Sequence, residues 1–118
     1  MSRHRDELYV HHIQEAITKA MEWAQVSRDA FMRDEFRQPA VIRQLEIAGE
    51  AAGRLSETFR EAHPAMEARE MKALRNVLIH GYADVDVVTV WDIIRHDLPR
   101  LRDYLHQLDR NREPELGD

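Results

Sequence analysis

The sequence contains no cysteine, and this absence removes several classes of function at once. Neither a disulfide framework nor a thiolate ligand or nucleophile can be built. Glycine and proline are also scarce, with four of each in 118 residues, and aromatic residues make up only 7%. With 43% hydrophobic and 33% charged residues, the composition is typical of a soluble helical domain and not of a disordered or fibrous chain.

Long hydrophobic runs are missing as well. No apolar stretch approaches the length of a membrane span, and the first six residues, Met1-Ser2-Arg3-His4-Arg5-Asp6, lack the apolar segment of a signal peptide. We therefore expect a cytoplasmic protein. The length predicts a single helical domain over residues 1–110, followed by a polar C-terminal tail over residues 111–118.

The formal net charge of −5 argues against broad electrostatic capture of nucleic acid. Within that balance, 15 of the 17 basic residues are arginine, which for most positions reflects no more than a preference for arginine codons. A nucleic-acid site must therefore be local and made of a few placed arginines.

Apolar residues that recur every three to four positions predict amphipathic helices over residues 6–27, 39–62, 65–80 and 87–108. No strand pattern and no internal repeat interrupts them. The predicted fold is an all-α, antiparallel four-helix bundle. In the second helix, Ile42 and Ile47 fall off the main apolar seam, so this helix is expected to bury a second face.

Residues with special backbone preferences mark the predicted helix boundaries. Ser27 is expected to cap a short helical turn, and either Asp84 or Asp86 is expected to cap the fourth helix. Gly81 is predicted to end the third helix, and Pro99 to kink the fourth.

Two glycines of the second helix, Gly49 and Gly53, lie about one turn apart. Glycine lowers the stability of a helix but lets another backbone come close. We therefore expect close packing of a second helix along both positions.

The stretch with most chemical content is Arg75-Asn76-Val77-Leu78-Ile79-His80-Gly81-Tyr82. Arginine binds phosphate through a fork of permanently charged donors, and histidine can move protons near neutral pH. His80 could take the proton from a ribose 2′-OH while Arg75 stabilises the charge on the phosphoryl oxygens. Asn76 could orient the histidine or a phosphate oxygen through its amide. This chemistry cleaves RNA to a 2′,3′-cyclic phosphate without a metal or any other cofactor, and it spares DNA.

The spacing between Arg75 and His80 raises a geometric difficulty. Residues five apart on a straight helix point about 140° away from each other. Two solutions stay open at this stage. A helix that ends at Gly81 would free the direction of His80, or a second copy of the chain would complete the site across a twofold axis.

The same stretch resembles the Arg-x4-His-x-Tyr signature of the HEPN superfamily, specifically the HepT-like ribonuclease toxins. The similarity extends to the second helix, Ala40-Val41-Ile42-Arg43-Gln44-Leu45-Glu46-Ile47-Ala48-Gly49-Glu50-Ala51-Ala52, and to the last helix, Asp84-Val85-Asp86 through Trp91 and Asp97-Leu98-Pro99. Arg5-Asp6-Glu7-Leu8-Tyr9 also fits, so the resemblance covers about residues 5–108. Many relatives carry a Pro-Trp-Arg-like element before the third helix, where this chain reads Met66-Glu67-Ala68-Arg69-Glu70-Met71.

The resemblance implies a homodimeric ribonuclease toxin of a type VII-like toxin–antitoxin pair, with catalytic roles for Arg75 and His80. It further implies that the partner antitoxin, a nucleotidyltransferase of the MntA type, attaches AMP to Tyr82 and so blocks the cleft. A bulky anion beside Arg75 would exclude RNA phosphate and repel it.

Two other interpretations of the sequence compete with this one. A non-catalytic helical module could use Tyr82 and the cleft only to bind a nucleotidyltransferase or a nucleotide. A metal-binding bundle is disfavoured, because di-iron bundles use two Glu-x-x-His pairs and this chain has none. Asp103 and His106 form the nearest single match, which fits a solvated helix face better than a metal site.

Overall fold

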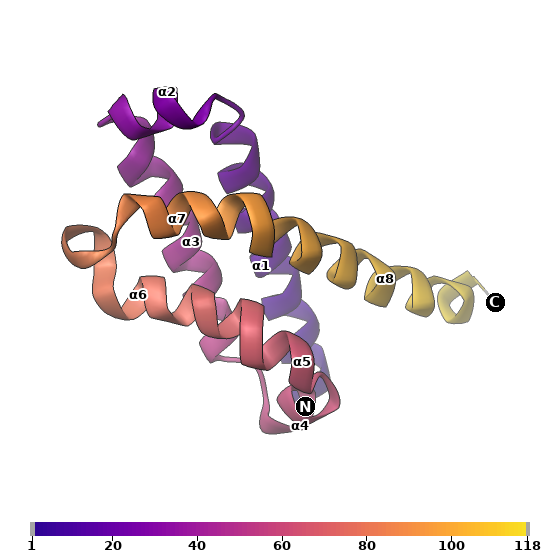
Figure 1. Cartoon of the computed structure of the whole chain (residues 1–118). Helices are drawn as coiled ribbons and strands as arrows, with labels where there is room; N and C mark the ends of the chain where they lie inside the picture. Colours follow the sequence, from indigo (N-terminus) through magenta and orange to yellow (C-terminus); the bar gives the residue numbers. More distant parts are fainter. Residues whose placement is uncertain (1, 118) are drawn as a thin grey trace.

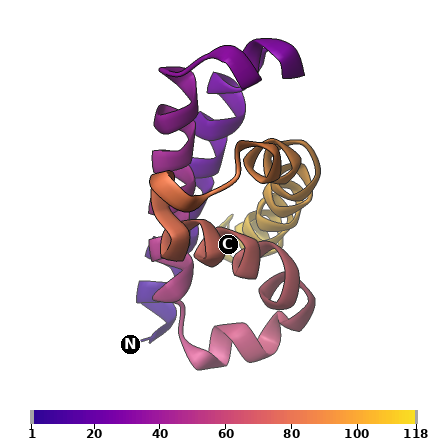
Figure 2. The same ribbon diagram turned by 60° about the vertical axis from the view of Figure 1, so that its left-hand side comes forward.

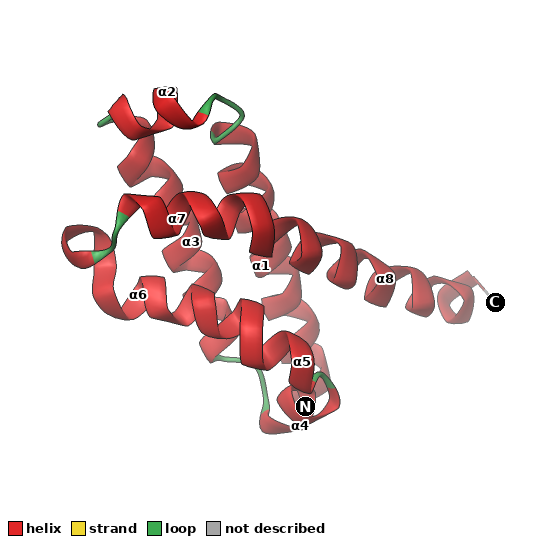
Figure 3. Ribbon diagram, in the orientation of Figure 1, coloured by secondary structure: helices red, strands yellow, loops and turns green. Residues whose placement is uncertain are grey.

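In the computed structural model, the chain is a bundle of helices joined by short loops (Figure 1). The structure describes the backbone of residues 2–117 and the side chains of residues 5–80 and 84–111. Helices account for every regular element over this range, and no strand occurs in it (Figure 3). The predicted all-α four-helix bundle is confirmed. None of the described helices combines the length and the apolar character needed to cross a membrane.

The elements follow one another as helices of very different length. In chain order they are α1 (Ser2–Trp23), α2 (Arg28–Arg33), α3 (Arg37–Gly53), α4 (Glu57–Ala62), α5 (Pro64–Met66), the π-helical segment η1 (Glu67–Met71), α6 (Lys72–Asp84), α7 (Val87–Asp92), the π-helical segment η2 (Ile93–Asp97) and α8 (Leu98–Gly117).

Helices α1 and α3 form the central antiparallel pair and lie side by side in both views (Figures 1 and 2). Ile13 and Ile17 of α1 are fully buried, as are Val41 and Leu45 of α3. Removing one such side chain from water stabilises the fold by about 1.5–3 kcal/mol. Ile42 is buried too, which confirms that α3 covers a second face. That second face is where α6 packs.

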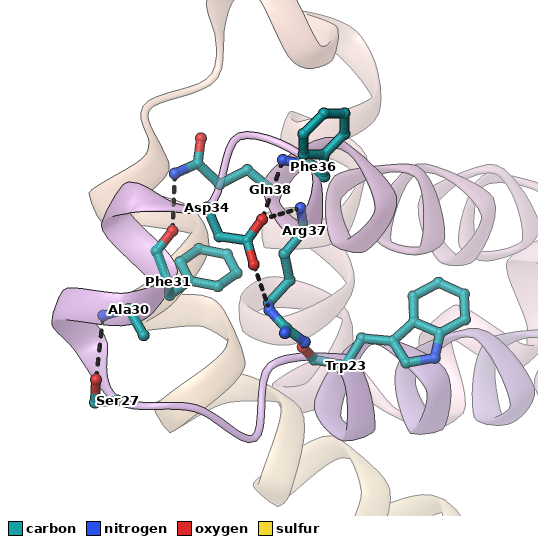
Figure 4. A network of polar contacts seen from close by, with 8 residues as sticks. All are labelled: Trp23, Ser27, Ala30, Phe31, Asp34, Phe36, Arg37 and Gln38. Atoms are coloured by element: carbon teal, nitrogen blue, oxygen red, sulfur yellow. Dashed lines mark hydrogen bonds and ion pairs between the residues drawn. The ribbon is translucent and has the colours of Figure 1, made fainter.

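The corner between α1 and α3 is held by side chains that bind the backbone (Figure 4). Ser27 caps α2 as predicted, since its Oγ accepts a hydrogen bond from the Ala30 N–H at 3.1 Å. The Asp34 carboxylate accepts the backbone N–H groups of Phe36 at 3.1 Å and Arg37 at 2.9 Å, and the Arg37 Nε–H at 3.0 Å. These contacts, the Arg37 backbone N–H first among them, lower the pKa of the Asp34 carboxyl. The first turn of α3 is thereby capped.

The second predicted helix is wrong in length, because α3 ends at Gly53 and α4 begins at Glu57. Ser56 makes the break: its Oγ accepts the Phe59 N–H at 3.1 Å and so caps α4. The backbone N–H and the hydroxyl of Ser56 also donate to Asp6 of α1, at 2.8 and 2.6 Å. The apolar spacing from Leu55 to Phe59 continues across the break, so periodicity alone could not reveal it.

The close-packing prediction holds for only one of the two glycines. A Cβ placed on Gly49 would lie 2.5 Å from the carbonyl oxygen of Leu74, so α3 and α6 touch backbone to backbone there. At Gly53, by contrast, a Cβ would have nothing within 4 Å. Gly53 is the last residue of α3 and makes no such contact.

The last helix runs on through Pro99 with an irregularity just before it. Asp86 caps its start, since the Asp86 Oδ1 accepts the Val88 N–H at 3.1 Å. In η2, the Leu98 N–H donates to the Ile93 carbonyl five residues earlier, which is π-helical pairing. Because proline has no N–H and crowds the carbonyl four residues before it, this π-helical pairing lies where Pro99 disturbs the regular α-helical pattern. The kink that the sequence predicts at Pro99 stays a prediction.

Helix α8 continues to Gly117 and extends beyond the rest of the bundle (Figure 1). It therefore includes most of the residues that the sequence assigned to a polar tail. The division into a domain of residues 1–110 and a tail of residues 111–118 stays a prediction.

Candidate functional site

The predicted motif lies on α6, which follows η1 without a break. The helix continues through Gly81 to Asp84, so the prediction that this glycine ends it is wrong. A glycine inside a helix costs about 1 kcal/mol relative to alanine, which the flanking helical residues can offset. The chain leaves the helix only after Asp84, just before Asp86 caps α7.

His80 consequently sits within a helix and not at its end. The five-residue spacing then keeps Arg75 and His80 about 140° apart around the axis. Of the two solutions left open by the sequence, the freed helix end does not occur.

Asn76 and His80 line a cavity of about 440 Å³ between α6 and the helix that begins at Val87. Both residues are exposed. Among the described residues, the acidic part of the lining consists of four carboxylates: Asp84, Asp86, Asp92 and Asp97. A cavity with this lining repels phosphate unless cations are brought to it.

Arg75 does not line that cavity. Its Nη2 lies 2.5 Å from Oε1 of Glu67 in η1, and Nε of Arg60 in α4 lies 3.8 Å from the same oxygen. The guanidinium is thus held near η1 and α4, which adjoin the start of α6, whereas α7 adjoins its end (Figure 1). The Arg75 side chain is 26% exposed and Glu67 17%, so this ion pair is partly removed from solvent.

The four predicted site residues therefore divide into separate groups within one chain. Asn76 and His80 share a cavity, and Arg75 belongs to a cluster with Glu67. The Tyr82 side chain lies outside the described residues. Catalysis by Arg75 and His80, positioning by Asn76 and modification at Tyr82 stay predictions.

Sequence reasoning missed Glu67, and a straight helix gives no signal that could find it. Residues eight apart on an α-helix are about 80° apart around the axis, whereas residues seven apart share a face. A π-helical segment accommodates one extra residue per turn, and so brings positions eight apart into line. Segment η1 does this for Glu67 and Arg75.

A second cavity, of about 480 Å³, lies between α1, α4 and α8. Its lining is mostly apolar and, among the described residues, includes no arginine or lysine. His63 borders it and hydrogen-bonds through Nδ1 to the hydroxyl of Tyr104. Burial lowers the pKa of His63 and raises the pKa of Tyr104. Without a cation, this cavity is a poorer place for a phosphate than the surroundings of Arg75.

Metal-ligating residues are dispersed over the part of the chain whose side chains are described. No three histidine, aspartate or glutamate side chains gather there in a way that could hold a metal ion.

Comparison with known proteins gives a consistent result over nearly the whole chain. The family described as "Ribonuclease HepT-like" matches residues 13–108. "Probable ribonuclease HepT" of Thermococcus cleftensis is 38% identical over 106 residues, which cover 89% of this chain and 94% of that protein. "Putative RNase MJ1380" of Methanocaldococcus jannaschii is 33% identical over 103 residues, which cover 86% of this chain and 94% of that protein.

A longer protein from the same archaeon, "Gamma-glutamylcyclotransferase and putative RNase MJ0434", is 34% identical over 110 residues. The match covers 89% of this chain but 50% of that protein, so the chain spans about half its length. No solved structure matches the chain significantly. Because the family match extends over most of the bundle, the chain belongs to the HepT-like ribonuclease family.

Proposed function

We propose that this protein is a metal-independent endoribonuclease that cleaves RNA by attack of a ribose 2′-OH on the adjacent phosphorus. His80 accepts the 2′-OH proton, the P–O5′ bond breaks as the new P–O2′ bond forms, and the departing 5′-oxygen takes a proton from water. The products are a 2′,3′-cyclic phosphate and a 5′-OH. Arg75 stabilises the charge that gathers on the phosphoryl oxygens, and Asn76 orients the reacting groups. The observation that carries this proposal is the Arg75-x4-His80-x-Tyr82 motif within a family match over residues 13–108.

We further propose that the working site is formed by two chains. Within one chain, Arg75 is held by Glu67, whereas His80 lines a cavity rich in carboxylates that Arg75 does not line. A single chain therefore does not bring the cation and the proton acceptor to the same cavity. Ile79 supports this arrangement, because it lies between the two residues in the sequence and its apolar side chain is 75% exposed. A homodimer packed through this part of α6 would cover that surface and place the arginine of one chain near the histidine of its partner.

The protein is proposed to act as a toxin that a MntA-type nucleotidyltransferase antitoxin neutralises. Transfer of AMP to the Tyr82 hydroxyl from ATP would release pyrophosphate and leave a phosphodiester anion on the tyrosine. Tyr82 follows Arg75 by seven residues on the same helix, a spacing that shares a face, so the added charge would stand on the side of Arg75 and repel RNA.

The test is incubation of the purified protein with RNA in the presence of EDTA. We expect cleavage that survives EDTA, yields 2′,3′-cyclic phosphate ends, and disappears in His80→Ala and Arg75→Ala variants with unchanged helical content. His106→Ala is the matched control, because this histidine is also exposed but lies on α8, outside the cavity. Cleavage that requires a divalent metal, or that persists without His80, would overturn the mechanism.

A second function is favoured by one observation. The four carboxylates around His80 would suit the basic surface of a protein partner better than a phosphate. In that case the chain is a non-catalytic module that binds its nucleotidyltransferase. Intact RNA under all conditions, together with tight binding of the partner, would select this alternative.

A further inference from the structure

We propose that Glu67 is the positioning residue for Arg75 in RNA cleavage: its carboxylate fixes the orientation in which the guanidinium meets the phosphate. This inference rests on the proposed ribonuclease function and adds a residue that lies outside the motif.

The contact between the two groups is short and partly enclosed. Nη2 of Arg75 lies 2.5 Å from Oε1 of Glu67, and the two side chains are 26% and 17% exposed. Hydrogen bonds between ionised partners are the strong ones, and exclusion of solvent reduces their screening. An arginine side chain has many rotamers, so one such bond removes much of the freedom that substrate binding would otherwise have to remove.

The backbone around Glu67 is itself fixed to the core. Met66, which precedes the segment, and Met71, its last residue, are both buried. They anchor η1, whose π-helical register places Glu67 in line with Arg75. Glu67 lies outside the Arg75-x4-His80-x-Tyr82 motif, so the motif alone does not predict the pair.

The cluster retains unused bonding capacity for a phosphate. Glu67 holds Arg75 through one oxygen and one nitrogen, and Arg60 approaches the same oxygen at 3.8 Å. Nη1 of Arg75, Nε of Arg60 and Oε2 of Glu67 are buried and make no hydrogen bond. Two cations share one carboxylate, so the cluster keeps a net positive charge. Buried donors are costly to leave unpaired, so a phosphate oxygen that reaches the two arginines as their side chains shift would stabilise the cluster.

The test compares Glu67→Gln with Glu46→Gln in RNA cleavage, with kcat and KM measured separately. Glu46 is a matched control, because it is also 17% exposed and pairs with its own arginine, Arg43, at 3.4 Å. We expect kcat of E67Q to fall by about 10- to 100-fold, as for other outer partners of a reactive group, with KM nearly unchanged. E46Q should match the wild type. Circular dichroism melts establish that both variants fold.

Dependence on Arg75 is examined in an Arg75→Lys background, where a charge is kept but the planar fork is lost. If Glu67 acts through Arg75, E67Q should reduce kcat far less in this background than in the wild type. Equal losses in both backgrounds would overturn the positioning role.

A readout independent of activity separates this inference from the proposed function. In the side-chain nitrogen NMR spectrum, a held Arg75 should give separate Nη signals that merge in E67Q. If the wild type cleaves RNA and E67Q has an equal or higher kcat, the positioning role is overturned but the ribonuclease function is not. Inactive wild type would overturn the ribonuclease, and merged Arg75 signals in the wild type would then overturn the positioning role as well.

Discussion

The α-carbon of Gly49 faces the backbone of Leu74 so closely that a Cβ at position 49 would lie 2.5 Å from the Leu74 carbonyl oxygen. The same Cβ would lie 3.3 Å from the Cβ of Leu78. Leu74 immediately precedes Arg75, so this contact sets how far the motif helix stands from the central pair α1 and α3. The position of the candidate site therefore depends on a glycine that carries no chemistry of its own.

Gly49→Ala should destabilise the protein, because α6 must move away from α3 to admit the methyl group. We expect a loss of about 1–3 kcal/mol in the free energy of unfolding, the usual cost of overpacking. The measurement is urea unfolding followed by circular dichroism.

Gly53→Ala is the matched control for that change. Nothing lies within 4 Å of a Cβ at Gly53, and alanine reduces the entropy of the unfolded chain. This variant should be unchanged or more stable by up to about 1 kcal/mol. Equal effects of the two substitutions would show that α3 and α6 do not meet at Gly49.

Mixing two inactive variants tests whether the site spans two chains. In a heterodimer of Arg75→Ala and His80→Ala chains, one site combines Arg75 of one chain with His80 of its partner, and the other site has neither. Unfolding and refolding the two variants together should therefore restore part of the RNA cleavage. Each variant refolded alone should stay inactive, and so should the mixture if both groups act within one chain.

The stability of the α4 and α8 contact should depend on pH through His63. Burial lowers its folded pKa below the ordinary 6.5, so the unfolded chain takes up the proton first as the pH falls. The free energy of unfolding should accordingly decrease from pH 6.5 downwards, until the folded pKa is reached. His63→Gln cannot titrate and should show a smaller decrease between pH 7.5 and 5.5 in paired urea titrations. Parallel curves for the two proteins would contradict a depressed pKa at His63.

Glu70 should change the free energy of unfolding with pH in the direction opposite to His63. Burial raises the pKa of folded Glu70 above 4.5, so the folded chain binds this proton more readily than the unfolded chain. The protein should therefore gain stability as the pH falls through the folded pKa towards 4.5. A Glu70→Gln variant should remove this gain without altering the His63 effect.

The sequence predicts the fold correctly where the regular spacing of apolar residues determines the helices. The buried stripes of Ile13, Ile17, Val41 and Leu45 follow helical spacing, and Ser27 has the side chain that a cap requires. The sequence predicts the geometry of the site less well, because that geometry depends on departures from regular helical spacing. Gly81 lies inside a helix although glycine usually ends one.

The same limit applies to the pair of Glu67 and Arg75. Their contact depends on a π-helical register, and nothing in residue spacing distinguishes a π-helical turn from an α-helical one before the tertiary contacts are known. The sequence does not predict the helix break at Ser56 for a related reason. Asp6, which binds Ser56, lies 50 positions away in the chain.

Tyr82 should be the residue through which a nucleotidyltransferase silences the protein. Tyr82→Phe keeps the aromatic ring but lacks the hydroxyl that would receive AMP, so it should cleave RNA as the wild type does. After incubation with a MntA-type nucleotidyltransferase and ATP, the wild type should gain AMP by mass spectrometry and lose activity, because the added phosphate repels RNA. Y82F should gain no AMP and remain active. Tyr9→Phe, at a tyrosine on α1, is the matched control and should be modified and inhibited like the wild type. Modified Y82F, or modified wild type that still cleaves RNA at full rate, would place the control of this protein elsewhere than at Tyr82.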